Sequence, residues 1–167
     1  MVFVRVGLGD VYANQWSLLA DVARKFAGSR ARIDQQQNIV CRWVLNESLY
    51  DIYQALGTIG FSAGGRETIR DVVACPGMDS YKLGITSSMD LNKALGETLG
   101  GMGDLDQLVE KMHIKTSVCP KSCGQHHIAS IGFHGAVVKG PGGQAPAYEL
   151  FLGGRSTESV GQRLERE

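Results

Sequence analysis

Residues 119–125 read Cys-Pro-Lys-Ser-Cys-Gly-Gln, and His126 and His127 follow directly. The two cysteines are four positions apart, and the proline and glycine beside them favour an irregular loop. Thiols at this spacing can point at one soft metal centre, because thiolates select zinc or iron–sulfur clusters. The stretch therefore predicts a metal or cluster site with Cys119 and Cys123 as ligands.

Two further cysteines lie upstream of this loop. Cys75 begins a similar turn, Cys-Pro-Gly, and becomes a candidate ligand when it is considered together with the loop cysteines. Cys41 lies within the hydrophobic run Ile39–Val44, so we expect it to be a core residue. If His126 joins the three candidate thiols, the set also suits a zinc ion.

The composition excludes several classes of protein. The chain has 167 residues, of which 43% are hydrophobic, and 17 basic side chains balance 17 acidic ones. A net charge of zero argues against nucleic acid or an anionic membrane as the main partner. No apolar run approaches the roughly 20 residues of a membrane-spanning helix, and the N-terminus lacks a signal-peptide pattern. We therefore expect a cytoplasmic location, where a disulfide framework is not expected.

The first half of the chain is expected to form a compact α+β unit, because strand-like and helix-like segments alternate along it. A short strand at 3–7 precedes a helix that is capped by Asn14 or Ser17 and ends near Ala27. The remaining segments are a β-rich stretch over 31–45, a helix over 49–56 and the start of a strand at 59–61. Glycines at 64 and 65 mark a joint to the second half.

The second half begins near Arg66 and again mixes helices with strands. Helices are predicted from Ser87 or Ser88 to about Leu99, and over 104–112. Strands are predicted over 114–118, 128–133, 136–139 and 148–152, with a hairpin turn at 140–143. The tail after residue 154 is expected to be frayed or helical.

The sequence contains no nucleotide-binding or hydrolase motif. Gly7-Leu-Gly follows a predicted strand, but Tyr12 occupies the place of the third glycine of a dinucleotide-binding fingerprint. A phosphate-binding loop, a serine-hydrolase elbow and paired carboxylates are also missing. His113 and His134 have no partner that the sequence reveals, so we expect both to be structural.

Two long stretches resemble the cluster-binding segments of the sirohaem-dependent nitrite and sulfite reductases. Residues 71–88, Asp-Val-Val-Ala-Cys-Pro-Gly-Met-Asp-Ser-Tyr-Lys-Leu-Gly-Ile-Thr-Ser-Ser, are similar to the first segment. Cys-Pro-Lys-Ser-Cys-Gly-Gln-His-His-Ile-Ala at 119–129, followed by Ile-Gly-Phe-His-Gly at 131–135, is similar to the second. Similarity also covers Arg-Ile-Asp-Gln-Gln-Gln-Asn-Ile at 32–39 and Tyr-Glu-Leu-Phe-Leu-Gly-Gly at 148–154. The resemblance extends over about residues 3–154.

The resemblance implies a fold and two cofactors. The fold is a ferredoxin-like half domain at 1–65, followed at 66–167 by an α/β domain that binds sirohaem and an iron–sulfur cluster and is shorter than usual. The cofactors are a [4Fe–4S] cluster and a sirohaem, bridged by one cysteine thiolate.

The resemblance also implies roles for individual residues. Cys75, Cys119 and Cys123 fall on cluster ligands, and Cys123 falls on the thiolate that also binds the sirohaem iron. The other cofactor-binding residues are Gln125 and, on the strand that contacts the macrocycle, Gln37 and Asn38.

The sequence departs from the family pattern Cys-x5-Cys at Tyr81, which replaces the second cysteine. A phenol is a hard ligand and matches a cluster iron poorly. Three interpretations remain open. Tyr81, water or another group completes a three-thiolate cluster; the cluster is labile or absent; or this copy of the sequence has changed. Lys121 also stands where the family usually has an uncharged residue.

The chain resembles only the second, cluster-bearing half of these enzymes. The first half usually supplies most basic groups for the sirohaem carboxylates and the substrate anion, so we expect a first-half partner or a homodimer. The leading hypothesis is a half or small subunit of a six-electron reductase of nitrite to ammonia or sulfite to sulfide, with a donor such as ferredoxin. The alternatives are a degenerate, non-catalytic domain with zinc, a cluster-only electron-transfer protein and a precorrin-3B synthase-like enzyme.

Overall fold

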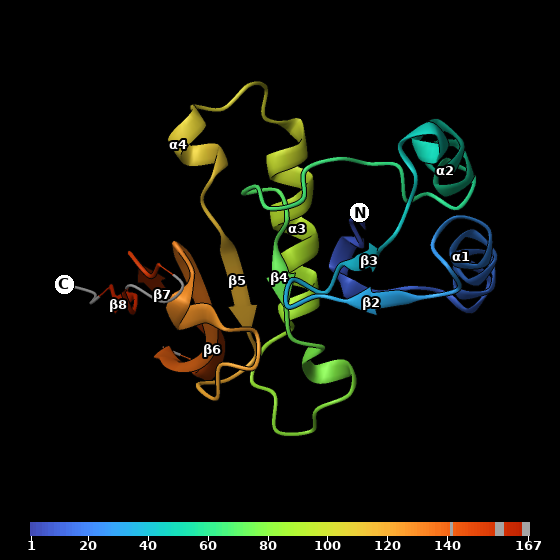
Figure 1. Ribbon diagram of the computed structural model, residues 1–167. Helices are drawn as coiled ribbons and strands as arrows, with labels where there is room; N and C mark the ends of the chain where they lie inside the picture. Colours follow the sequence, from blue (N-terminus) through green and yellow to red (C-terminus); the bar gives the residue numbers. More distant parts are fainter. Residues whose placement is uncertain (141, 156–158, 165–167) are drawn as a thin grey trace. The chain divides into compact units, whose positions relative to one another are not determined.

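The computed structural model describes residues 1–140, 142–155 and 159–164. The chain divides into two compact units, Met1–Arg66 and Glu67–Glu167. Each unit contains helices and strands, so the predicted α+β class is confirmed (Figure 1).

The first unit is a small antiparallel sheet with two helices. Its three strands lie in the order β1-β3-β2, and the β2–β3 hairpin turns through the polar residues 34–38. The elements are β1 (Val2–Val4), α1 (Ala13–Phe26), β2 (Ala31–Ile33), β3 (Ile39–Cys41) and α2 (Leu49–Gly57), with 3-10 turns at Gly7–Gly9 and Asn46–Ser48.

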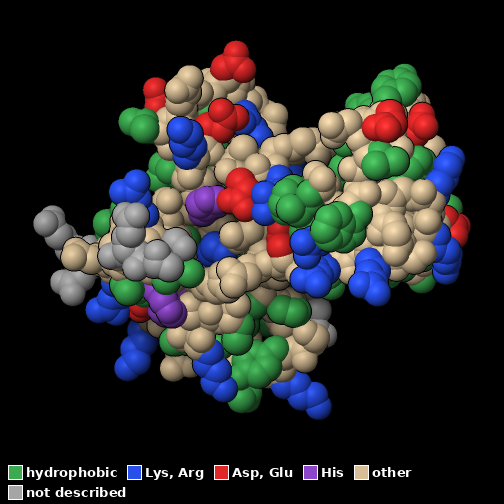
Figure 2. All heavy atoms as spheres, viewed as in Figure 1, with side chains coloured by type: hydrophobic (Ala, Val, Ile, Leu, Met, Phe, Trp, Pro, Cys, Tyr) green, Lys and Arg blue, Asp and Glu red, His purple; other side chains and the backbone are tan. Residues whose placement is uncertain are grey.

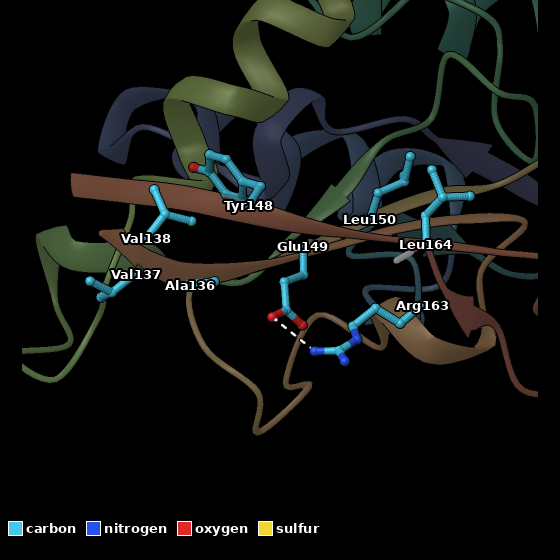
Figure 3. Close-up of a pocket in the computed structure, with 8 residues that line it drawn as sticks. All are labelled: Ala136, Val137, Val138, Tyr148, Glu149, Leu150, Arg163 and Leu164. Atoms are coloured by element: carbon cyan, nitrogen blue, oxygen red, sulfur yellow. Dashed lines mark hydrogen bonds and ion pairs between the residues drawn. The ribbon is translucent and has the colours of Figure 1, made fainter. Parts of the chain in front are cut away.

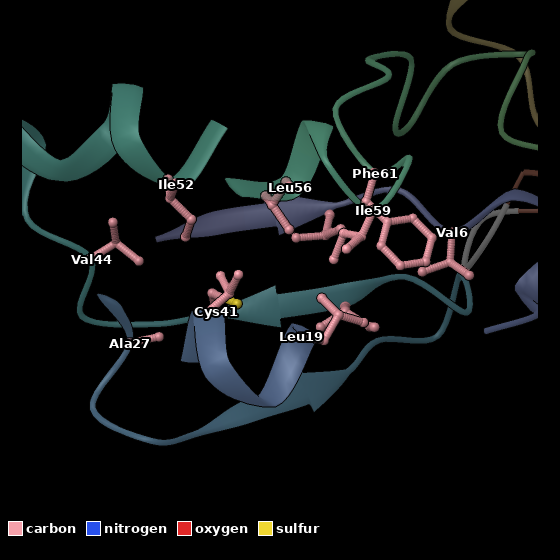
Figure 4. Close-up of a cluster of buried hydrophobic side chains, with 12 residues drawn as sticks. Val6, Leu19, Ala27, Cys41, Val44, Ile52, Leu56, Ile59 and Phe61 are labelled. Atoms are coloured by element: carbon pink, nitrogen blue, oxygen red, sulfur yellow. The ribbon is translucent and has the colours of Figure 1, made fainter. Parts of the chain in front are cut away.

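The core of this unit lies between the sheet and both helices. Leu19 of α1 and Ile52 and Leu56 of α2 pack with side chains from β1 and β3 (Figure 4). Cys41 is 1% exposed within this cluster, and burial raises the pKa of its thiol. The prediction that Cys41 is a core residue is confirmed.

Two local predictions for this unit are wrong. Helix α1 begins at Ala13, because the Gln15 side chain caps it by accepting a hydrogen bond of 2.9 Å from the Tyr12 N–H. Residues 59–61 form no strand. The N–H of Phe61 donates to the carbonyl of Leu56 at 2.9 Å, and Gly60 takes a left-handed φ of 81°, so this segment ends helix α2.

The second unit is a five-stranded mixed sheet in the order β4-β5-β6-β7-β8. Strands β4, β5 and β6 run parallel, and β6, β7 and β8 are antiparallel. The elements are β4 (Val73–Ala74), α3 (Ser88–Gly101), α4 (Gln107–Glu110), β5 (Ile114–Ser117), β6 (Ile131–Gly140), β7 (Gly143–Leu152) and β8 (Gln162–Arg163), with 3-10 turns at Gly77–Asp79 and His126–Ile128.

Helix α3 packs on β4 and β5, and it runs beside β4 in Figure 1. The hydrophobic cluster of this unit joins the end of α3 to β5, with Ile69, Leu99 and Ile114 buried at its centre. Ser87 caps the helix by accepting a hydrogen bond of 3.2 Å from the Asp90 N–H, as the sequence predicts.

The strands of the second unit differ in extent from their predictions. Residues 131–140 form one continuous strand rather than two, because every residue from Ile131 to Gly140 pairs with β7. Gly140 pairs with Gly143, so the predicted hairpin at 140–143 is confirmed, although Pro141 lies outside the described residues. The described part of the tail contains the strand β8 rather than a helix, and residues 156–158 and 165–167 lie outside it.

The surface carries both signs of charge. Acidic and basic side chains are both spread over the face shown in Figure 2. Over the residues that the structure describes, no helix is long and apolar enough to cross a bilayer.

Candidate functional site

Two of the candidate cysteines lie together because the strands that precede them are neighbours. Cys75 directly follows β4, and Cys119 lies two residues beyond the end of β5. Strands β4 and β5 are parallel, so their carboxyl ends meet at one edge of the sheet. The Cys75 N–H donates to the Thr116 carbonyl at 3.2 Å, which continues the pairing to this edge.

All three candidate cysteines line one hollow of about 320 Å³. The spacing of Cys119 and Cys123 places both thiols of the loop there, and Cys75 contributes from the neighbouring strand. Cys75 is buried, Cys119 is half-buried and Cys123 is exposed. The other lining residues are Pro76, Gly77, Ser80, Tyr81, Ser117, Val118 and Lys121. The structure therefore brings together the thiols that the sequence singles out.

Two polar groups contact the sulfur of Cys75. It accepts a hydrogen bond of 3.2 Å from the Val118 N–H and lies 3.6 Å from the Ser88 Oγ. The Ser88 hydroxyl donates to the Cys75 carbonyl at 2.6 Å, which ties the start of α3 to the turn. Backbone N–H groups aimed at sulfur stabilise a thiolate and tune a bound cluster.

The loop from Cys119 to Gln125 lies close against β5. Ser122 and Gln125 both have left-handed φ angles near 60°. A Cβ on Gly124 would overlap the Thr116 carbonyl oxygen, so only glycine lets the backbone approach the strand this closely. The Gly124 N–H donates to the Ser117 Oγ at 3.2 Å.

Gln125 is engaged within the protein. Its side-chain oxygen accepts a hydrogen bond of 2.9 Å from the Nζ of Lys115, a residue of β5 that is only 5% exposed. Gln125 thus fastens the cysteine loop to the sheet.

His126 is buried outside the cysteine hollow. Its Nδ1 lies 3.1 Å from the Ser117 Oγ, and its ring packs against His134 and Phe151 with centroids 4.9 and 5.0 Å away. Among residues 1–140, 142–155 and 159–164, no three His, Cys, Asp or Glu side chains converge on one metal ion. A zinc site of three thiolates and His126 is therefore not formed here.

The buried ring of His126 predicts a loss of stability in acid. Burial, then the charges of His134 and His127, lower the pKa of His126 to about 4. In the unfolded chain the ring takes its usual pKa near 6.5. The unfolded state therefore binds the extra proton first as the pH falls. Above about pH 6.5 the neutral ring makes its full contribution to the free energy of unfolding. This contribution falls by up to about 3 kcal/mol as the pH drops towards 4.

Urea unfolding at pH 7 and pH 4.5 measures this effect. His126→Asn is expected to reduce the pH dependence of the free energy of unfolding. His127→Asn, at the exposed neighbouring position, is expected to change it much less, because burial and His134 lower the pKa of His126 more than His127 does. Equal pH dependence in the wild type and in His126→Asn would contradict the assignment.

His134 is paired across the hairpin. Its Nε2 lies 3.3 Å from a carboxylate oxygen of Glu149, its register partner on β7, and its Nδ1 lies 3.0 Å from the Gly135 carbonyl. Both partners belong to the same hairpin, so these contacts fix the ring within it. The structural role expected for His134 agrees with this arrangement.

Tyr81 reaches the hollow from the turn that follows Cys75. The Lys121 Nζ lies 5.8 Å from the centroid of its ring. The pKa of Lys121 is raised, first by a hydrogen bond with Tyr81 and then by the negative charges of Tyr81, Cys119 and Cys123. The two residues at which the sequence departs from the family pattern therefore face each other.

Gln37 and Asn38 belong to the first unit. Asn38 is fully buried, and its Oδ1 accepts a hydrogen bond of 2.9 Å from the Val6 N–H. Gln37 has a left-handed φ of 64° at the β2–β3 turn. Asp34 shapes this turn by accepting hydrogen bonds of 2.9 Å from the N–H groups of Gln36 and Asn38.

Sequence inspection missed the residues that support the cysteine loop. Lys115 and Ser117 lie in a strand that is buried at all four positions, so no alternation of polar and apolar residues marks them. Their partners, Gln125 and His126, are distant contacts that only the folded chain reveals. A lysine in a short buried strand is the one signal that could have pointed to this support.

A larger hollow of about 480 Å³ lies on the β6–β7–β8 sheet (Figure 3). Its charged side chains, Glu149 and Arg163, form an ion pair of 3.3 Å. The side chains that line it carry no thiol and no imidazole. The cysteine hollow is therefore the candidate site, although it is smaller.

The cysteine hollow fits an iron–sulfur cluster in part. In a four-iron cluster each thiolate binds a different iron, so the sulfurs need not converge on one point as they do around zinc. Three thiols and a backbone N–H aimed at the Cys75 sulfur suit such a group. A fourth thiol does not line the hollow.

Comparison with known proteins finds similarity to nitrite and sulfite reductases. Residues 1–59 match the family model described as the nitrite/sulfite reductase ferredoxin-like half domain. The chain is 26% identical over 156 residues to sulfite reductase (ferredoxin) 1 of Mycolicibacterium paratuberculosis. It is 25% identical over 154 residues to the ferredoxin–nitrite reductase of Synechococcus elongatus. Each alignment covers 92% of this chain but only 28% and 30% of these relatives, so the chain spans less than a third of their length.

Solved structures share the fold. The Mycobacterium tuberculosis NirA protein superposes with a TM-score of 0.82 at 24% identity, over 99% of this chain and 31% of its own. Dissimilatory sulfite reductase I superposes with a TM-score of 0.79 at 10% identity, over 98% of this chain and 57% of its own. The predicted fold, with its ferredoxin-like half domain, is confirmed.

Proposed function

We propose that this chain, whose residues 1–59 match the nitrite/sulfite reductase ferredoxin-like half domain, is the cluster-bearing half or small subunit of a sirohaem- and [4Fe–4S]-dependent reductase. The substrate is nitrite, reduced to ammonia, or sulfite, reduced to sulfide. Residues 1–65 act as the ferredoxin-like half domain, and residues 66–167 hold the cofactors.

One observation carries this proposal. Cys75, Cys119 and Cys123 come from two segments far apart in sequence and line the same hollow at the carboxyl edge of a parallel sheet. The three thiols form no disulfide with one another, so they are available as ligands. When bound, the cluster and sirohaem supply the electron-transfer chemistry of a six-electron reduction.

The chain's own residues have distinct tasks in this proposal. The three thiolates hold the cluster, and Cys123, the most exposed of them, is the ligand shared with the sirohaem iron. The Val118 N–H orients the Cys75 sulfur. Gln125 contributes to cofactor binding through the loop that it fastens to Lys115.

The remaining parts of the proposed site come from outside the second unit. Gln37 and Asn38 are proposed to contact the macrocycle, with Asn38 held in place by the Val6 N–H. A first-half partner or a second copy of this chain supplies further basic groups for the substrate anion. A ferredoxin-type donor supplies the electrons, as the names of the relatives indicate for those proteins.

An anaerobic absorption spectrum tests the proposal, with iron, zinc, acid-labile sulfide and sirohaem quantified on the same sample. We expect iron and sulfide in similar amounts, together with sirohaem bands, after reconstitution with both cofactors. Iron and sulfide without sirohaem binding would favour a cluster-only electron-transfer protein. A colourless protein that takes up only zinc, or no metal, would overturn the proposal.

A further inference from the structure

The position of Tyr81 is set by the turn that leaves Cys75. The Tyr81 N–H donates to the Gly77 carbonyl at 3.1 Å, and the Tyr81 carbonyl accepts from the Gly84 N–H at 2.9 Å. Gly77 has a φ of 79°, which turns the chain back towards the hollow. These two hydrogen bonds fix the backbone of Tyr81. The residue is half-buried and lines the hollow together with the three cysteines.

A four-iron cluster in this hollow needs one ligand more than the three thiols provide. The hydroxyl of Ser117 is already engaged, because it accepts from the Gly124 N–H and contacts the Nδ1 of His126. Lys121 carries an ammonium group, which has no lone pair to offer a metal. Ser80 and Tyr81 remain, and a phenol loses its proton far more readily than an aliphatic hydroxyl.

Lys121 adds a reason to choose Tyr81 over Ser80. It lies on the loop between Cys119 and Cys123, and its Nζ lies 5.8 Å from the centroid of the Tyr81 ring. Its ammonium group therefore stands on the same side of the hollow as the Tyr81 ring. A positive group at this place also offsets the charge of three thiolates gathered around one cluster.

We propose that Tyr81 supplies the fourth ligand of the cluster through its phenol oxygen, with Lys121 placed to stabilise that oxygen. This inference rests on the proposed function, because it presupposes a cluster on the three thiolates. On binding, the O–H bond of Tyr81 breaks, an iron–oxygen bond forms and the proton passes to solvent. No change of oxidation state is involved.

Four forms of the chain test the proposal after anaerobic reconstitution: wild type, Tyr81→Phe, Tyr81→Cys and Tyr53→Phe. Tyr53 is a matched control because it is an exposed tyrosine of helix α2 in the first unit. Resonance Raman spectra detect the vibrations of an iron-bound phenolate. Iron and sulfide per chain, and the electron paramagnetic resonance signal of a three-iron cluster after brief oxidation, report on the fourth iron.

We expect phenolate vibrations in the wild type and in Tyr53→Phe, and none in Tyr81→Phe or Tyr81→Cys. Loss of groups outside a metal's own ligands already lowers affinity about 10–100-fold, so loss of this ligand in Tyr81→Phe is expected to weaken retention of the fourth iron by at least about 10-fold and to give a stronger three-iron signal. Tyr81→Cys is expected to keep four irons. A cluster in the wild type without phenolate vibrations, and with the same iron retention as Tyr81→Phe, would overturn this inference alone. No cluster in any form, Tyr81→Cys included, would overturn the proposed function.

Discussion

Cys123→Ser is expected to lose most of its iron on reconstitution and to lose the spectral coupling between cluster and sirohaem. Cys123 is one of the three thiols in the hollow and the most exposed of them. A serine hydroxyl is a hard ligand that keeps its proton at neutral pH, so it replaces a thiolate poorly. Even the loss of groups outside the metal's own ligands lowers affinity about 10–100-fold, so we expect a larger loss here.

Cys41→Ala is the matched control for this experiment. It removes a thiol as well, but from the core of the first unit rather than from the hollow. We expect lower thermal stability and an unchanged ratio of iron to protein. The absorption spectrum and the iron content of both variants are compared under the same conditions. A Cys123→Ser protein with the haem bands and iron content of the wild type would exclude the bridging role.

Gly124→Ala is expected to disrupt the cysteine loop. The added Cβ would overlap the carbonyl oxygen of Thr116, a fully buried residue of strand β5, which pairs with a strand on each side. The loop and the strand cannot both keep their places, so either the hydrogen bond from Gly124 to Ser117 or the pairing of β5 is lost. Overpacking of this kind costs about 1–3 kcal/mol and occasionally more, and we expect the upper end here.

Gly96→Ala makes the same chemical change at a site with space. Gly96 lies within helix α3, and a Cβ there meets nothing within 4 Å. Alanine is the better helix former by about 1 kcal/mol, so this variant is expected to be more stable than the wild type. Urea unfolding of both variants, with iron uptake measured in parallel, tests whether Gly124→Ala is destabilised while Gly96→Ala is stabilised. Normal stability and iron uptake in Gly124→Ala would show that the loop does not lie against β5 as described.

Local sequence patterns predicted many of the elements. Turn residues and helical spacing located α1, α2 and α3 to within a few residues, and Ser87 was identified as a cap of α3. These features depend on neighbours within one or two turns of the chain, so they are visible without the fold. The segment at 59–61 shows the limit, because its strand-like residues form the end of a helix through one hydrogen bond to Leu56.

The predictions for the cysteines also agree with the structure where they depend on neighbouring residues in the sequence. Proline and glycine beside Cys75, Cys119 and Cys123 mark turns, whereas the hydrophobic neighbours of Cys41 mark a buried strand, and the structure agrees at each of these positions. The choice of His126 as a fourth ligand failed. Sequence proximity to Cys123 places it near the loop, but its ring packs on β6 and β7 side chains instead.

By itself the sequence determined the α+β class, the loops that carry the thiols and the resemblance to the nitrite and sulfite reductases. Only the tertiary structure decided which groups share one hollow. The parallel pairing of β4 with β5 brings Cys75 to Cys119, and the turn at Gly77 adds Tyr81. The physical reason is that strand pairing and burial act between residues far apart in the chain, where spacing along the sequence carries no information about distance.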